Sequence, residues 1–136
     1  MVYMNGDNSL SNYTDLDIAE MSKIDFKGNV NTIVLWDKRY TKTKLLKLNY
    51  QNPYITNNPP HTVLTATING QTLSPTSSVE LDMLSETTLS DFVSFSKANY
   101  PANHYALLFW SHSDGWRSVT SKGLQSDEDS NSNAYR

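Results

Sequence analysis

The sequence predicts an α/β fold in which strands and helices alternate along the chain. Short apolar segments at residues 2–4, 30–36 and 104–110 each end on polar residues, which is typical of buried strands in a parallel sheet. Two segments with apolar residues at three- and four-residue steps stand between them, which indicates helices. A strand, a helix and a strand with short connections make a βαβ unit, for which a right-handed crossover is expected.

The first strand is expected at residues 2–4, followed by a turn and a helix. Asn8, Ser9 or Ser11 can cap this helix, and the acidic residues in its first half suit the helix dipole. The helix should end where Gly28 favours a left-handed turn. Its core face is predicted from three- and four-residue steps, which bring together Leu10, Tyr13, Asp17, Met21 and Ile24, with an overlapping set of Thr14, Ile18 and Met21.

The second strand, at residues 30–36, is rich in β-branched and apolar residues and ends on Asp37. The chain then alternates apolar and polar residues over 43–50 and again over 62–68, which predicts half-solvated antiparallel strands. An Asn-Gly turn follows the second of them. We therefore expect a small β-rich insert at about residues 40–80, with an Asn- and Pro-rich loop inside it.

The second helix should begin at Ser85 and end before Pro101, because the residue before a proline disfavours helix. Thr88 and Asp91 stand three residues apart and resemble a capping box. The third parallel strand is then expected at residues 104–110, in the core of the sheet.

With 136 residues the chain is one domain or part of one. Residues 1–122 carry the predicted elements, whereas residues 123–136 are polar and acidic and are expected to form a mobile surface tail. A strand that begins almost at the first residue suggests that the numbering starts inside a longer precursor, with any signal segment removed before it.

The composition argues against several classes of function. The net charge is −3 at pH 7 and no basic stripe exists, so the chain is not expected to bind nucleic acid. No segment approaches the roughly 18 apolar residues of a membrane span. The chain has no cysteine, which removes disulfides, zinc–thiolate sites and a thiol nucleophile from these 136 residues.

His112 is the best-placed candidate for catalysis. It follows a predicted parallel strand, and open α/β sheets carry their sites at the carboxyl ends of strands. Imidazole, with an ordinary pKa near ~6.5, exchanges protons at neutral pH. The alternative is a loop histidine without a catalytic role. His61 and His104 are interpreted as loop histidines, and the three histidines show no metal-ligand spacing, so no metal site is predicted.

Asp7 and Asp37 also follow predicted parallel strands, at the same edge of the sheet as His112. They could bind a cation or the basic group of a substrate. Alternatively they cap helices or pair with Lys38 and Arg39, an interpretation that the sequence favours.

Polar residues flank the candidate histidine. Ser111, Ser113 and Asp114 are interpreted as turn residues, because neighbours in sequence rarely reach the geometry of a Ser-His-Asp triad. The tryptophans are more readily explained as core and rim packing, and among them Trp116 is a candidate for substrate contact.

Two sets of segments match the pattern of a known family. The first set is residues 2–10, 17–21 and 29–37, and the second is residues 86–92, 98–112 and 115–116. In this order they resemble the clostripain family of cysteine peptidases over about residues 2–116, with the insert as the least similar part.

The resemblance implies a caspase-like fold, a three-layer sandwich with a mainly parallel sheet and helices on both faces. It implies a cysteine peptidase that works through a His/Cys dyad, in which His112 is the histidine. A backbone N–H near Ser113 would help to hold the oxyanion. Family members usually carry glycine at the position of Ser113; serine keeps the N–H but disfavours the positive φ that glycine allows.

The resemblance further implies a precursor that cuts itself after a basic residue, for which Arg136 is the expected site. A separate heavy chain would then complete the sheet and carry the catalytic cysteine and most of the acidic S1 pocket. The expected substrates are proteins or peptides with Arg, or Lys, at the cleaved bond. The sequence requires no cofactor, although the family resemblance is compatible with calcium. Resemblance to secreted bacterial members implies export or a place in the cell envelope.

A function of another class is the competing hypothesis. A non-catalytic α/β binding module, or a pseudoenzyme without a nucleophile, would be a stable monomer of 15.4 kDa. Against it, three parallel strands and a small hairpin with one exposed edge make a poor stand-alone fold. Co-purification with a cysteine-containing polypeptide would distinguish the two hypotheses.

Overall fold

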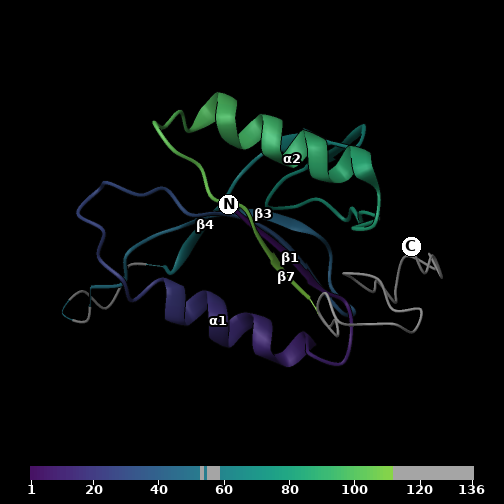
Figure 1. Ribbon diagram of the computed structural model, residues 1–136. Coiled ribbons are helices and arrows are strands. Elements are labelled where there is room, and N and C mark those ends of the chain that lie inside the picture. The colour runs from purple at the N-terminus through teal and green to yellow at the C-terminus, as the bar shows by residue number, and fades with distance from the viewer. Residues whose placement is uncertain (53, 55–58, 112–136) are drawn as a thin grey trace, which may run out of the picture.

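The computed structural model describes residues 1–52, 54 and 59–111. Their main feature is a five-stranded sheet with the strand order β4-β3-β2-β1-β7 (Figure 1). β1 pairs in parallel with β2 and β7, whereas β3 is antiparallel to both β2 and β4. The five strands are β1 (Val2–Gly6), β2 (Ile33–Lys38), β3 (Lys44–Leu48), β4 (His61–Val63) and β7 (Leu108–Trp110).

One long helix covers each face of this sheet, as Figure 1 shows. α1 (Thr14–Met21), which follows the 3-10 turn η1 (Ser11–Tyr13), packs on one face. α2 (Glu86–Asn99) packs on the other face, together with a two-stranded sheet of β5 (Ala66–Ile68) and β6 (Gln71–Leu73). The predicted α/β class with helices on both faces is confirmed, and the described part of the sheet is mixed.

β1 is the centre of the core, because all five of its residues are buried. Its side chains alternate between the faces. The ring of Tyr3 packs on Phe92 of α2 with the centroids 5.9 Å apart, and Met4 packs with Ile18 of α1. Burial of one such side chain contributes about 1.5–3 kcal/mol, so β1 anchors both helix layers.

The first helix ends sooner than the sequence predicts. α1 stops at Met21 rather than near Gly28, and β2 likewise begins later than expected. Ser22 gives the reason, because its hydroxyl lies 2.8 Å from the carbonyl of Ile18 and 3.0 Å from that of Pro60. This fixes the chain where it leaves the helix. The left-handed turn at Gly28 is present, with φ +76°, but it lies within the loop.

The insert divides between two sheets. β3 confirms the first predicted antiparallel strand, but the single strand predicted at residues 62–68 is wrong. β4 stays in the main sheet, whereas β5 turns towards α2 and buries Ala66 and Ile68 in the core beneath that helix. A strand that continued along β3 could not bury these two side chains there. The turn after β5 is confirmed, with positive φ at Asn69 and Gly70.

α2 begins after Ser85 and ends before Pro101, as predicted. The capping box is wrong, because Ser85 is the N-cap residue and the two polar side chains bind another segment. The carboxylate of Asp91 accepts the backbone N–H of Asn69 at 2.8 Å, and the hydroxyl of Thr88 lies 3.2 Å from the Asn69 amide nitrogen. These residues therefore fasten the β5–β6 turn to the helix.

The third parallel strand is shorter and more exposed than predicted. Of the expected residues 104–110 only the last three form β7, and Leu108 and Phe109 are 56% and 49% exposed. Their exposure contradicts the prediction of a buried core strand. The reason is that β7 is an edge strand in the described part of the chain, with β1 on one side only. The predicted tail, residues 123–136, lies outside the described residues.

Candidate active site at the carboxyl edge of the sheet

The strand order defines where a site is expected. From β1 the chain passes through α1, on one face, to β2; it reaches β7, on the other side of β1, from α2 on the opposite face. The order of the strands therefore reverses between β1 and β7. Ligands of open α/β sheets bind in the crevice outside the carboxyl ends of the strands at such a switch point. The residues that follow β1, β2 and β7 are thus the candidates.

Polar side chains gather at this edge and are kept from water. Asn5 and Asp7, at the end of β1, and Asp37, in β2, each have 0% exposure. Asn5 is paired with Asp37 in the register of β1 and β2. Ser111 follows the last residue of β7 at the same edge. His112 comes directly after it in the sequence and lies outside the described residues.

The carboxylate of Asp37 is held by the insert. The hydroxyl of Thr43 donates to Asp37 Oδ1 at 3.1 Å, and the backbone N–H of Leu81 donates to the Thr43 hydroxyl oxygen at 2.9 Å. Lys38, one of the two basic residues that the sequence offered as partners of Asp37, forms an ion pair with Asp15 of α1. Because both Thr43 and Asp37 are buried, this relay fixes the direction of the carboxylate. Thr43 could not be predicted as a partner of Asp37, since a single threonine before a strand has no distinguishing pattern.

The turn after β1 is shaped by neighbours of Asp7. The side chain of Asn8 accepts the backbone N–H of Leu10 at 2.9 Å and donates to the carbonyl of Asn5 at 3.0 Å. A Cβ at Gly6 would lie 2.9 Å from the carbonyl oxygen of Asp37 and would overlap the methyl group of a threonine in α1. Only glycine therefore allows α1 to start so close to the carboxyl ends of β1 and β2.

The α1 side of β7 is an open groove of about 240 Å³. The indole N–H of Trp110 donates to the carboxylate of Asp17 at 2.6 Å and ties the end of β7 to α1. The groove continues along the edge of β7 and is lined by Val2, Met4, Asp17, Glu20, Met21, Leu108, Phe109 and Trp110. Within the described residues, the outer edge of β7 thus has no strand beside it and presents apolar side chains.

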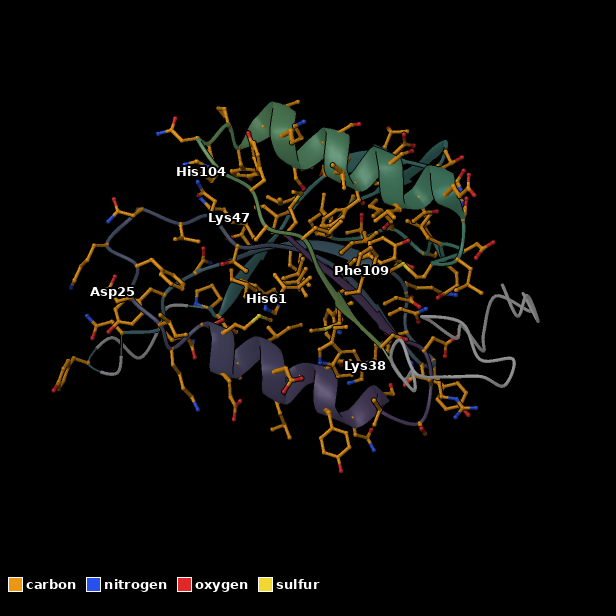
Figure 2. All side chains as sticks on the ribbon, viewed as in Figure 1. Asp25, Lys38, Lys47, His61, His104 and Phe109 are labelled. Atoms are coloured by element: carbon orange, nitrogen blue, oxygen red, sulfur yellow. The ribbon has the colours of Figure 1, made fainter. Side chains whose placement is uncertain are left out.

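The other two histidines lie away from this edge. Figure 2 shows His104 near Lys47, at the end of the sheet opposite to Lys38. His61 is on β4, the strand farthest from β7, with its ring 6.3 Å from that of Trp36. Burial lowers the pKa of His61, and the charge of Lys44 lowers it further. Neither histidine belongs to the candidate site.

Within residues 1–52, 54 and 59–111, no three acidic or histidine side chains are placed to hold a metal ion. No helix in this part of the chain is long and apolar enough to cross a membrane. Of the predicted site residues, Asp7 and Asp37 do lie at the same edge, whereas Ser113, Trp116 and Arg136 lie outside the described residues, as His112 does. Sequence reasoning missed Asn5 and Gly6, whose burial and close contacts only the structure shows.

Comparison with known proteins shows which family the chain matches and which solved structures share its fold. A model of the clostripain family matches residues 2–136. An inactive zymogen C11 protease from Parabacteroides distasonis is 28% identical with a TM-score of 0.61, covering 87% of this chain but 31% of that one. The chain therefore spans about a third of the zymogen. No curated protein matches the chain.

Two further solved structures share the fold at lower identity. A B. fragilis cysteine protease is 24% identical with a TM-score of 0.60, and the match covers 90% of this chain and 93% of that one. A clostripain from Bacteroides thetaiotaomicron, solved with the peptide inhibitor BTN-VLTK-AOMK, is 16% identical with a TM-score of 0.59. That match covers 88% of this chain and 92% of the other. The similarity confirms the predicted caspase-like architecture.

Proposed function

Because the chain belongs to the clostripain family of cysteine peptidases, we propose that it is the histidine-bearing part of an endopeptidase that cleaves after Arg or Lys. The observation that carries this proposal is the pair of buried carboxylates, Asp7 and Asp37, at the switch-point edge where β7 ends, two residues before His112 in the sequence. A catalytic histidine and an acidic site for a basic side chain are the two elements that such specificity requires from this edge.

The two carboxylates favour a basic substrate for an electrostatic reason. A crevice lined by one sign of charge, with low-dielectric walls, focuses the potential and attracts the opposite charge. The carboxylates of Asp7 and Asp37, both at this edge, attract a guanidinium or ammonium group in the same way. The inhibitor solved with the Bacteroides thetaiotaomicron clostripain has the peptide part VLTK, which ends in lysine and agrees with a basic preference.

The proposed reaction is acyl transfer. A thiol attacks the carbonyl carbon of the Arg or Lys residue while His112 accepts the thiol proton, and His112 then protonates the leaving amine. Water hydrolyses the thioester, and a backbone N–H near Ser113 stabilises the oxyanion of each tetrahedral intermediate. Because these 136 residues contain no cysteine, the thiol belongs to another part of the precursor.

The proposed cysteine-containing segment completes the sheet at β7. Support comes from the exposed backbone and apolar side chains of this edge, with Leu108 56% exposed. The solved zymogen, of which this chain matches 31%, supports a precursor with further chain. In this proposal the processed product is one half of a two-chain enzyme.

The experiment uses the full precursor, expressed and allowed to process. Hydrolysis of a fluorogenic peptide with Arg before the cleaved bond is measured for the wild type, for His112→Ala and for the control His104→Ala. We expect His112→Ala to lose about 10³-fold or more in kcat, because the general base is removed, and His104→Ala to match the wild type. Equal activity in His112→Ala would remove this residue from the mechanism. A wild type that cleaves no peptide would favour the non-catalytic module.

A further inference from the structure

Three side-chain atoms at the switch point are buried without a hydrogen-bond partner. They are Nδ2 and Oδ1 of Asn5 and Oγ of Ser111. Asn5 is 0% exposed, so bulk solvent does not reach its amide. Buried polar groups are nearly always satisfied, and each exception in a native fold calls for an explanation.

The strand register directs the two residues towards each other. In the register of β1 and β7, Tyr3 pairs with Phe109 and Met4 with Trp110, so its continuation by one residue brings Ser111 opposite Asn5. Neighbouring strands are about 4.8 Å apart, which is within side-chain reach. The rings of Tyr3 and Phe109 contact each other at 5.9 Å, and alternation along the strands brings Asn5 and Ser111 onto that same face.

The hydroxyl of Ser111 and the amide of Asn5 are complementary. A hydroxyl both donates and accepts, and a carboxamide offers one oxygen and one NH₂ group, so a rotation of either side chain suffices to join them. The described structure has no such bond. It also leaves the outer edge of β7 without a strand, and the regular pairing ends at Trp110, one residue before Ser111.

We propose that Asn5 is a positioning residue for the catalytic histidine, and that it acts through a side-chain hydrogen bond to Ser111. Ser111 is covalently joined to His112, so a bond that fixes Ser111 against β1 fixes the point at which the chain enters the histidine. The bond forms when a strand of the remaining precursor pairs with β7 and orders its carboxyl end. This inference rests on the proposed function only for the role of His112.

The test is a double-mutant cycle in the processed full-length enzyme. Asn5→Ala, Ser111→Ala and the double variant are assayed with the fluorogenic Arg peptide, together with Ser111→Thr, which keeps the hydroxyl. Ser96→Ala is the matched control, because Ser96 Oγ is also buried without a partner but lies on α2, away from β7. Each single Ala variant should lower kcat about 10-fold with little change in KM, as expected for the loss of one hydrogen bond and a misplaced base.

The decisive result is the double variant. If the two side chains act through one bond, it should lose about the same 10-fold as either single variant, and Ser111→Thr should restore most of kcat. Losses that multiply to about 100-fold, a change in KM instead of kcat, or an equal loss in Ser96→Ala would overturn the proposal.

The failure of the proposed function is distinguishable from that of this inference. If the wild type shows no peptidase activity, or His112→Ala retains it, the proposed function fails. The same proteins are then compared by thermal unfolding. Lowering of the unfolding temperature by a similar amount in the single and double variants supports the Asn5–Ser111 bond, and additive losses refute it.

Discussion

The two ends of the parallel strands are built differently. At the carboxyl end, Asn5, Asp7 and Asp37 are fully buried, and Asp37 is fixed by Thr43. At the amino end, the loop between α1 and β2 exposes apolar side chains such as Ile24 (54%). Polar groups are thus kept from water at one end, while apolar groups face water at the other. Stability alone favours the reverse, so the carboxyl end has the character of a site that function maintains.

The amino end also has a pocket, of about 450 Å³, between the α1–β2 loop and β3. A charged pair in the same loop, Asp25 and Lys27, illustrates the difference from the carboxyl end. The Lys27 ammonium lies 2.6 Å from the Asp25 carboxylate and 80% of the Lys27 side chain is exposed. The hydrogen bond to Lys27 lowers the pKa of Asp25, but a pair so open to water contributes little to stability. The amino end therefore supplies matched controls for substitutions of Asp37 and Gly6.

The largest difference is expected between two aspartates. Asp37→Asn removes a buried charge that we assign to the binding of a basic side chain, and kcat/KM for the Arg peptide should fall about 100-fold. Asp25→Asn, at the exposed end, should change kcat/KM by less than about 2-fold. Both are measured in the processed enzyme, together with a peptide that carries Gln in place of Arg. Equal losses for the Arg and Gln peptides would show that Asp37 acts on the fold rather than on specificity.

A second comparison uses two glycines. Gly6→Ala should lower the free energy of unfolding by about 2–3 kcal/mol, because a Cβ there meets the carbonyl oxygen of Asp37 at 2.9 Å. Gly28→Ala should lose only about 1 kcal/mol, since its positive φ is strained but no atom lies within 4 Å of the new Cβ. Urea unfolding of the two variants measures both values. A more stable Gly6→Ala protein would contradict the close packing at the carboxyl end.

The smallest effect is a pH dependence at the amino end. Burial lowers the pKa of His61 in the folded protein, so the unfolded chain binds the proton more readily. The contribution of neutral His61 to stability is complete above pH ~6.5 and is lost as the pH falls from there through the folded pKa. The unfolding temperature should therefore fall between pH 7.5 and 5.5, and less steeply in His61→Gln. Identical slopes in the two proteins would contradict this.

The sequence predicted the parts of the fold that depend on local pattern. Short apolar runs located β1 and β2, alternation located β3, and Ser85 and Pro101 marked the limits of α2. The sequence-based prediction failed where contacts between residues distant in the chain determine the end of a helix or the place of a strand. The hydroxyl of Ser22 ends α1 beside Pro60, and burial beneath α2 draws β5 away from the main sheet. Neither contact leaves a periodic signal in the chain.

The candidate site was likewise predicted only in part. The sequence placed Asp7 and Asp37 after parallel strands, and both do lie at one edge of the sheet. It attributed a turn to Ser111 and no role to Asn5, because an unsatisfied amide is a property of the packed interior. The exposure of β7 was missed for another reason. An apolar run predicts that its side chains are buried, but it does not identify the segment that buries them.

The central claim is that this chain supplies the histidine and another segment of the precursor supplies the thiol. The most direct measurement is intact-mass analysis of the processed, purified enzyme after reaction with an Arg-directed acyloxymethyl ketone. We predict that this chain co-purifies unlabelled with a cysteine-containing polypeptide, and that the label is on that partner. Recovery of this chain alone, or a label on this chain, would contradict the account.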